Sequence, residues 1–236
     1  MFLLLKKLNP LIFVLFIPLL FSCSTKNIQN SNEEVSLSLK NHQSINLNNL
    51  MFNLLEADNK LTPEIVQNND GSSFYSYRLK PGEKEISLKE IKKRVLLGSD
   101  FYKKDRENSI SLLRKINELK INNRLENIDN GALGLWIPKE DLILINYCAV
   151  KMGSPIFLDT LRHEAIHVAQ SCFNNSRKSF PKRIGLPLEF SKEINLNLSH
   201  YIYSKNTQEV MYIEREAFTY SKIDGAAIKL LNKFCK

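Results

Sequence analysis

Two histidines, His163 and His167, stand four residues apart with Glu164 between them. Four residues are slightly more than one helical turn, so a helix here presents both imidazoles on one face. This arrangement suits a zinc ion bound by two imidazoles, with a carboxylate beside it to accept a proton from a zinc-activated water. At average composition the pattern arises by chance in about one chain in a hundred of this length. The alternative is a pair of surface histidines on an amphipathic helix that binds no metal.

The helix that carries this pattern is predicted to begin at Ser154–Pro155, with serine as the N-cap and proline in the first turn. It is expected to end at Asn174–Asn175. Apolar residues at helical spacing predict one buried stripe along it: Leu158, Leu161, Ala165, Val168 and Cys172. His163 and His167 each lie about 160° around the helix from Ala165. The imidazoles are therefore expected to point away from the stripe, toward solvent or a cleft.

A third protein ligand is needed at a catalytic zinc site, with water in the fourth position. Suitable side chains after the motif are His200, Glu214, Glu216 and Asp224. The two glutamates lie on a predicted helix that Asn206 and Glu209 begin as a capping box. The apolar stripe of this helix is Val210, Ile213, Ala217 and Tyr220. Glu214 and Glu216 flank the stripe at similar angles on opposite sides, so helical periodicity does not decide between them.

Two short segments together resemble a known signature. The sequences HEAIH (163–167) and EREA (214–217) are similar to the HExxH and ExEA motifs of gluzincin zinc metallopeptidases, including the HtpX-like group. The resemblance covers about residues 133–220 and implies that His163, His167 and Glu216 bind Zn²⁺. It also implies that Glu164 is the catalytic general base. That group usually has an aspartate, which helps to orient the site, where this chain has Phe218.

The chemistry of such a site adds further candidates. An oxyanion needs a hydrogen-bond donor besides zinc, and Tyr220, one turn after Glu216, is the first candidate. The others are His200, Tyr201 and Tyr203. The strand expected at residues 142–147 could pair with an extended peptide, as edge strands do in zincins.

The expected function is zinc-dependent hydrolysis of peptide bonds in a peptide or protein substrate. One alternative is a zinc-binding envelope lipoprotein without catalysis that binds a partner protein, although pure binding would not need Glu164. The other alternative is a structural envelope lipoprotein in which the motif is fortuitous.

The first 22 residues indicate an export signal. Lys6 and Lys7 precede an apolar run, Leu11–Phe21, that is too short for a membrane-spanning helix. The run ends in LFSC (20–23), which resembles the lipobox of bacterial lipoproteins and implies that Cys23 becomes the lipidated first residue. Serine rather than aspartate after Cys23 implies the outer membrane, facing the periplasm, in a cell with two membranes. The alternative is an ordinary cleaved signal that leaves Cys23 unmodified.

Export permits disulfides, and three cysteines follow Cys23: Cys148, Cys172 and Cys235. Because Cys172 lies on the predicted buried stripe, we expect one disulfide that joins it to Cys148 or Cys235 and leaves the third cysteine unpaired.

The distribution of charge gives no support for a nucleic-acid partner. Removing Lys6 and Lys7 with the signal lowers the formal net charge from +8 to +6. The basic residues are spread along the chain among acidic ones and form no block interleaved with aromatic residues. Nothing therefore indicates a nucleic-acid partner.

The remaining pattern predicts an α+β domain at residues 47–236, joined to the anchor by a disordered tether at residues 23–46. Alternating residues predict a strand at 73–79, and runs at 133–137 and 142–147 predict a hairpin. Ser87 with Glu90 predicts one helix start, and apolar spacing predicts another helix that ends near Lys120. The rest of residues 47–86 is ambiguous, and residues 176–205 are expected to form a loop. Together with the resemblance, this predicts a small zincin-like domain: a hairpin, the motif helix, and a C-terminal helix with the third ligand.

Overall fold

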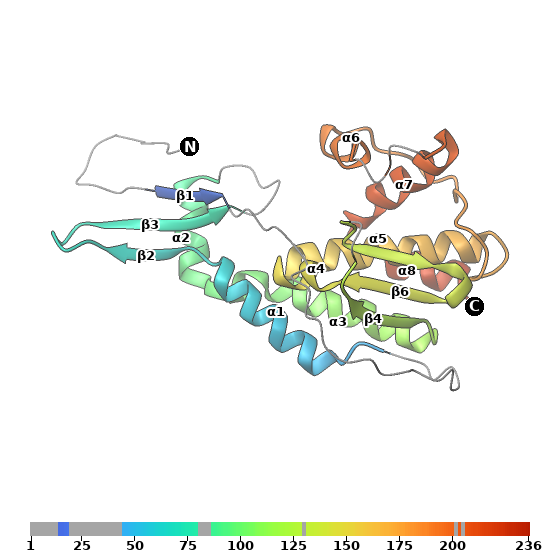
Figure 1. The fold of residues 1–236 in the computed structure, drawn as a ribbon, viewed down its shortest axis with the longest axis horizontal. Coiled ribbons are helices and arrows are strands. Elements are labelled where there is room, and N and C mark those ends of the chain that lie inside the picture. The colour runs from blue at the N-terminus through green and yellow to red at the C-terminus, as the bar shows by residue number, and fades with distance from the viewer. Residues whose placement is uncertain (1–13, 19–43, 80–85, 129–130, 201–202, 204–205) are drawn as a thin grey trace, which may run out of the picture.

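The computed structural model describes residues 14–18, 44–79, 86–128, 131–200, 203 and 206–236, and it shows the predicted α+β class (Figure 1). The elements in chain order are β1 (Val14–Pro18), α1 (Leu47–Leu61), β2 (Glu64–Gln67), β3 (Ser73–Leu79), α2 (Leu88–Leu97), the 3-10 helix η1 (Gly98–Tyr102), α3 (Lys103–Glu118), β4 (Asn122–Glu126), β5 (Gly134–Ile137), the 3-10 helix η2 (Pro138–Glu140), β6 (Leu142–Asn146), α4 (Tyr147–Lys151), α5 (Ser154–Phe173), α6 (Lys192–Leu198), α7 (Gln208–Ser221) and α8 (Ala226–Phe234).

One small sheet lies beside the helix of the histidine pair. Its strand order is β4–β6–β5, with β6 parallel to β4 and antiparallel to β5. The predicted hairpin is confirmed as β5 and β6, in a register that pairs Trp136 with Ile143. The prediction that residues 142–147 form an edge strand is wrong, because β6 is central and all of its residues are buried. The edge strand that contacts α5 is β5.

The other sheet has the strand order β1–β3–β2 and includes the strand predicted at 73–79. β1 pairs in parallel with β3 but belongs to residues 1–22, which the sequence assigns to the export signal. Cleavage of that signal would leave β3 paired with β2 alone. Cys23 and most of the expected tether lie outside the described residues. No helix in the described ranges is long and apolar enough to cross a membrane.

The motif helix α5 is in contact with α3, α7, α8 and β5, in the half of the molecule that carries the β4–β6–β5 sheet (Figure 1). The buried stripe predicted for it is confirmed, since Leu161, Ala165 and Val168 have no solvent exposure. α5 ends at Phe173 with Asn174 as its C-cap, which is the predicted boundary. A helix packed on several sides holds its side chains in fixed directions, and this is what a binding site on it requires.

The start of α5 is fixed by a residue far away in the sequence. Ser154 begins the helix as predicted, but it is not the N-cap, because Gly153 occupies that position and makes no side-chain cap. Asp58 of α1 accepts hydrogen bonds from the Ser154 backbone N–H at 2.8 Å and from its hydroxyl at 2.6 Å. Asp58 also pairs with Arg106 of α3 at 2.5 Å, and both side chains are buried. This network ties α1 and α3 to the N-terminus of α5, where a negative charge also favours the helix dipole.

A disulfide joins the last turn of α5 to the end of α8. Cys172 is bonded to Cys235, with the two Cα atoms 5.2 Å apart. This is one of the two pairings predicted for Cys172. The prediction that one of the three later cysteines stays unpaired is wrong, because Cys148 is disulfide-bonded as well.

Four helices, α1, α4, α6 and α8, lie where the sequence predicts none. α1 occupies part of the ambiguous segment 47–86, and α6 lies inside the loop expected at residues 176–205. α6 is only two turns long, and its N-cap Ser191 accepts a hydrogen bond from the Ile194 backbone N–H. The N-cap of α7 is Thr207, one residue after the predicted Asn206.

Candidate metal centre

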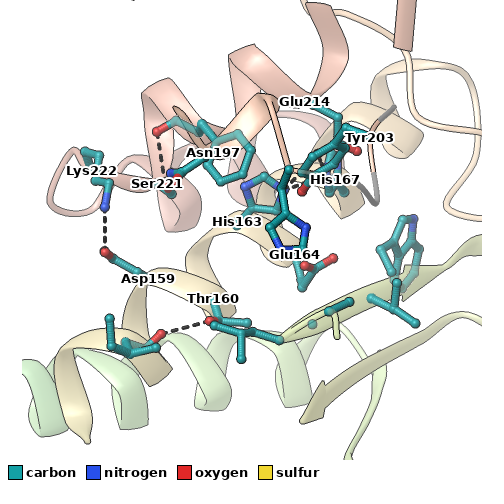
Figure 2. Close-up of a pocket in the computed structure, with 18 of the residues that line it drawn as sticks. Asp159, Thr160, His163, Glu164, His167, Asn197, Tyr203, Glu214, Ser221 and Lys222 are labelled. Atoms are coloured by element: carbon teal, nitrogen blue, oxygen red, sulfur yellow. Dashed lines mark hydrogen bonds and ion pairs between the residues drawn. The ribbon is translucent and has the colours of Figure 1, made fainter. Parts of the chain in front are cut away.

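The side chains of His163, His167 and Glu214 converge on one point between α5 and α7 (Figure 2). The two Nε2 atoms are 3.0 Å apart, and Glu214 Oε2 lies 3.1 Å from His163 Nε2 and 3.4 Å from His167 Nε2. Zinc bonds of about 2.0–2.1 Å in a tetrahedron place ligand atoms about 3.3 Å apart. The three side chains thus already stand at nearly the spacing that a shared ion needs. Two imidazole nitrogens and one carboxylate oxygen are a donor set that zinc uses at catalytic sites.

Glu216 lies away from the histidine pair and has a different task. Its side chain is fully buried (0% exposed). Its carboxylate accepts four hydrogen bonds, from Gln170 Nε2 at 2.9 Å and from the backbone N–H groups of residues 184–186 at 2.9, 3.0 and 2.9 Å. Both oxygens are therefore occupied in holding this loop against α5 and α7. The structure does not bring Glu216, the ligand implied by the resemblance, to the histidines; it brings Glu214, the alternative.

Gln170 connects the buried Glu216 to the histidine pair. Its Nε2 donates to Glu216 and to the Ile213 carbonyl, so its Oε1 is the acceptor that lies 2.7 Å from His167 Nδ1. The proton of a neutral His167 imidazole is then on Nδ1, and Nε2 faces the cluster with a free lone pair. Sequence reasoning missed Gln170, although a polar residue three positions after a histidine on a buried helix is a signal for such a contact.

His163 is oriented by packing. Its ring centroid lies 4.3 Å from that of Phe218 and 4.6 Å from that of His167. Its Nδ1 is buried and has no hydrogen-bond partner among the described residues. Phe218 thus gives this histidine an apolar contact on the side of α7.

Glu164 lies next to the histidine pair and faces the same cavity (Figure 2). Burial raises the pKa of its carboxyl group, while the positive charges of His163 and His167 oppose the increase. The strand β5 passes very close to it. A Cβ atom on Gly134 would lie 2.8 Å from Glu164 Oε1 and 2.7 Å from Thr160 Cγ2, which is too close for a side chain. Glycine at position 134 is thus what lets β5 approach the glutamate.

The ligand candidates are strongly coupled electrostatically. Burial favours the neutral form of His167, but the charge of Glu214 and its hydrogen bond outweigh burial and raise the pKa of His167 to about 9. Burial likewise favours the neutral form of Glu214, yet the charge of His167 and the hydrogen bonds from both histidines hold the pKa of Glu214 well below its usual range. Without a metal, a proton shared within this cluster supplies the positive charge. A cation that binds here has to displace that proton.

The candidate oxyanion donors differ in whether they lie near the histidine pair. Tyr203 lines the cavity and hydrogen-bonds to Glu214, and burial together with the Glu214 charge raises the pKa of its hydroxyl. Tyr220 instead packs against the hydrophobic core, so the structure does not bring it to the histidines. His200 also lines the cavity, and Tyr201 lies outside the described residues.

The cluster forms part of the wall of a cavity of about 1430 Å³. This volume exceeds the usual range for small-molecule sites, about 300–1,000 Å³, and leaves room for an extended polymer. Lys222, at the end of α7, pairs with Asp159 of α5 at 2.7 Å (Figure 2). It also pairs with Glu193 of α6 at 3.2 Å, which holds α6 beside the cavity. Apolar side chains contributed by β5, α6, α7 and the loops between them include Leu135, Trp136, Phe180, Leu196 and Val210.

Comparison with known proteins finds no family model that matches the chain, and no curated protein or solved structure that is significantly similar to it. The candidate metal centre therefore rests on the geometry of its own residues.

Proposed function

We propose that this protein is a zinc metallopeptidase that hydrolyses peptide bonds. The observation that carries the proposal is the convergence of His163, His167 and Glu214 beside a buried glutamate, Glu164, in the wall of a large cavity. A structural zinc site would be closed by four protein ligands, whereas three ligands and a cavity fit a catalytic site with an open position. The resemblance to gluzincin motifs supports the same reaction, with Glu214 in place of Glu216 as the third ligand.

Each residue then has a defined task. A bound zinc ion would acidify a water molecule and polarise the scissile carbonyl. Glu164 accepts the proton of the attacking water and passes it to the leaving amine, a task for which a raised carboxyl pKa is suited. The Tyr203 hydroxyl would be a donor to the developing oxyanion once a cation bound to Glu214 releases it from its hydrogen bond to that carboxylate. Gln170 holds His167 in the tautomer that binds a cation.

The substrate that fits this arrangement is an extended polypeptide. β5 is an edge strand, contacts α5, and contributes Gly134, Leu135 and Trp136 to the cavity wall. The backbone of an edge strand can pair with an added strand, which would pass alongside Glu164 and the histidine pair. The peptide-pairing role expected for residues 142–147 thus falls to β5.

We further propose that the protein is exported and anchored in the envelope membrane through a lipid on Cys23, most simply in the outer membrane facing the periplasm. The support is the sequence LFSC (20–23) after an apolar run. Mass spectrometry of the mature N-terminal peptide tests this. A diacylglycerol adduct on Cys23 is the expected result. A lipid on Cys23 would leave Cys148 without a cysteine partner, because Cys172 pairs with Cys235, so the anchored protein should have a free Cys148 thiol. An unmodified or disulfide-bonded Cys23 overturns the anchor, since a thioether-linked lipid removes the thiol.

The test of the enzyme proposal combines metal content with peptide hydrolysis. His163→Ala, His167→Ala and Glu214→Ala should each lose stoichiometric zinc, because each removes one of three protein ligands. Glu164→Gln should keep the zinc and lose hydrolysis by about 10²–10⁴-fold, because an amide of the same size cannot accept the proton. Glu209→Ala, at an exposed glutamate on the same helix α7, is the control and should behave as wild type.

Two outcomes would defeat this function. If wild-type protein holds no stoichiometric zinc, the cluster is an ion pair and nothing more. If it binds zinc through these ligands but Glu164→Gln cleaves peptides as fast as wild type, or neither cleaves, the zinc-binding lipoprotein without catalysis becomes the better description.

A further inference from the structure

The outward face of α2 combines exposed leucines with lysines and has no exposed acidic residue. Leu96 is 85% exposed, and Leu97 and Leu88 are 43% and 38% exposed. At helical spacing the face consists of two adjacent rows, Leu88, Lys92 and Leu96, and Lys89, Lys93 and Leu97. Each row thus mixes apolar and positively charged side chains. A leucine as exposed as Leu96, on a helix face that exposes two further leucines, is unusual for a surface that faces only water.

The opposite side of α2 holds the helix firmly in place. Ile91 is buried (1% exposed). Arg94 donates a hydrogen bond to the Tyr77 hydroxyl of β3 at 2.5 Å, and its guanidinium lies 4.9 Å from the centroid of the Phe101 ring. Glu90, whose side chain is 33% exposed, pairs with Arg94 at 3.4 Å and lies at the edge of this inner side. Lys93 lies at the border as well, since its Nζ is 5.5 Å from the centroid of the Phe101 ring. The leucines of the outer face are therefore not misplaced core residues, because other side chains, Ile91 and Arg94, already hold the helix against the rest of the fold.

We propose that this face of α2 docks on an anionic membrane surface. Leucine side chains can enter the boundary between headgroups and acyl chains, while lysines extend their charged ends to anionic headgroups. The charge of the face decides among possible occupants. Lys89, Lys92 and Lys93 pair with no acidic residue in the part of the chain that the structure describes, so they complement an anionic surface, and the leucines favour a bilayer over a free polyanion. This inference does not depend on the peptidase chemistry. A lipid on Cys23, where present, would add to it, because a single weak contact and a lipid together give stable membrane binding.

The place of α2 in the fold gives such docking a consequence. α2 lies beside the β1–β3–β2 sheet, and α7 lies toward the other end of the long axis of the molecule (Figure 1). A protein seated on α2 would hold the histidine cluster away from the lipid and turn it toward substrates in the adjoining compartment.

The experiment measures lysine accessibility in the unmodified full chain. The protein is mixed with vesicles of zwitterionic phosphatidylcholine alone, or of the same lipid with about one third phosphatidylglycerol, and treated with a membrane-impermeant amine-acylating reagent. Peptide mass spectrometry then gives the modification rate at each lysine. Lys89, Lys92 and Lys93 should be modified several-fold more slowly with the anionic vesicles, and high salt should remove the protection. Lys229, exposed on α8, is the internal control and should not change.

Matched variants distinguish docking through the leucines from a general effect of replacing an exposed apolar residue by serine. The double variant Leu96→Ser, Leu97→Ser should lose the protection, whereas Ile223→Ser, at a residue 48% exposed after α7, should keep it. Several results would overturn the proposal: no protection with anionic vesicles, equal protection with both vesicles, or protection that appears without vesicles as protein concentration rises, which would indicate self-association. Retained protection in the leucine double variant would also overturn it. None of these readouts requires zinc or peptide hydrolysis, so a failure here leaves the proposed enzyme untouched.

Discussion

Alanine at Glu216 and alanine at Glu214 should have opposite consequences, although the two residues are neighbours on α7. Glu216→Ala removes the acceptor of four hydrogen bonds in a fully buried place. Glu214→Ala removes a carboxylate that contacts the histidine pair. We therefore expect Glu216→Ala to destabilise the fold while metal still binds, and Glu214→Ala to lose metal while the fold remains.

The magnitude for Glu216→Ala follows from the donors that lose their acceptor. A buried donor left without a partner costs about 1–3 kcal/mol. The costs of four neighbouring donors do not add fully, because water can enter the vacated space and the loop at residues 184–186 can relax. A loss of about 3–5 kcal/mol in unfolding free energy is expected, as for removal of one partner from a buried charged network. Glu216→Gln keeps one oxygen and the side-chain size, so its loss should be smaller, about 1–3 kcal/mol.

The assay is urea unfolding with chelator present, together with the zinc content of folded protein after reconstitution. Glu216 supports Gln170, which in turn holds His167, so Glu216→Ala can weaken zinc binding by about 10–100-fold through this contact. Saturating zinc should still give one ion per chain. The reasoning is refuted if Glu216→Ala unfolds within about 0.5 kcal/mol of wild type, or if it cannot be loaded with zinc while Glu214→Ala can.

Three further predictions test other parts of the structure. Zinc binding should weaken about tenfold for each pH unit below about 9, because the pKa of His167 is raised to about 9 and its proton has to leave; competition with a chromophoric chelator at several pH values measures this. Gly134→Ala should displace the Glu164 side chain and lower the hydrolysis rate at unchanged zinc content, since its Cβ would lie 2.8 Å from Glu164 Oε1; a normal rate would contradict the contact. Asp58→Ala should cost about 3–5 kcal/mol in urea unfolding, because Arg106 loses its buried partner; a change below about 1 kcal/mol would show that the pair is unimportant.

Local patterns were sufficient for several elements of this fold. Alternation predicts β3, and the β5–β6 hairpin follows from two β-rich runs separated by a proline turn. Ser87 caps α2 as the sequence indicates. In each case the residues that decide the structure lie within a few positions of one another. The motif helix was predicted in the same way, including its buried stripe and its end.

The sequence predictions are wrong where contacts between residues far apart in the chain determine the structure. β6 is central because β4, from earlier in the chain, pairs with its other side, and no local pattern reports that pairing. The cap of α5 comes from Asp58, 96 residues before Ser154. A serine followed by proline is a sound local signal for a cap, but a buried carboxylate can outcompete a hydroxyl as acceptor for the first helix N–H groups. Tertiary contacts thus shifted the cap without moving the helix.

The choice between Glu214 and Glu216 shows why the sequence cannot identify the third ligand unaided. Both glutamates flank the same apolar stripe, so either can face α5 once α7 rotates slightly about its axis. That rotation is set by what surrounds α7: Ile213 and Ala217 are buried, and the loop at residues 184–186 presents three backbone N–H groups on one side. Three backbone N–H donors so close together require a carboxylate as their acceptor, and Glu216 provides it. Glu214 is then left on the side of the histidines, and a site ligand is selected by a structural requirement at residues 184–186, earlier in the chain.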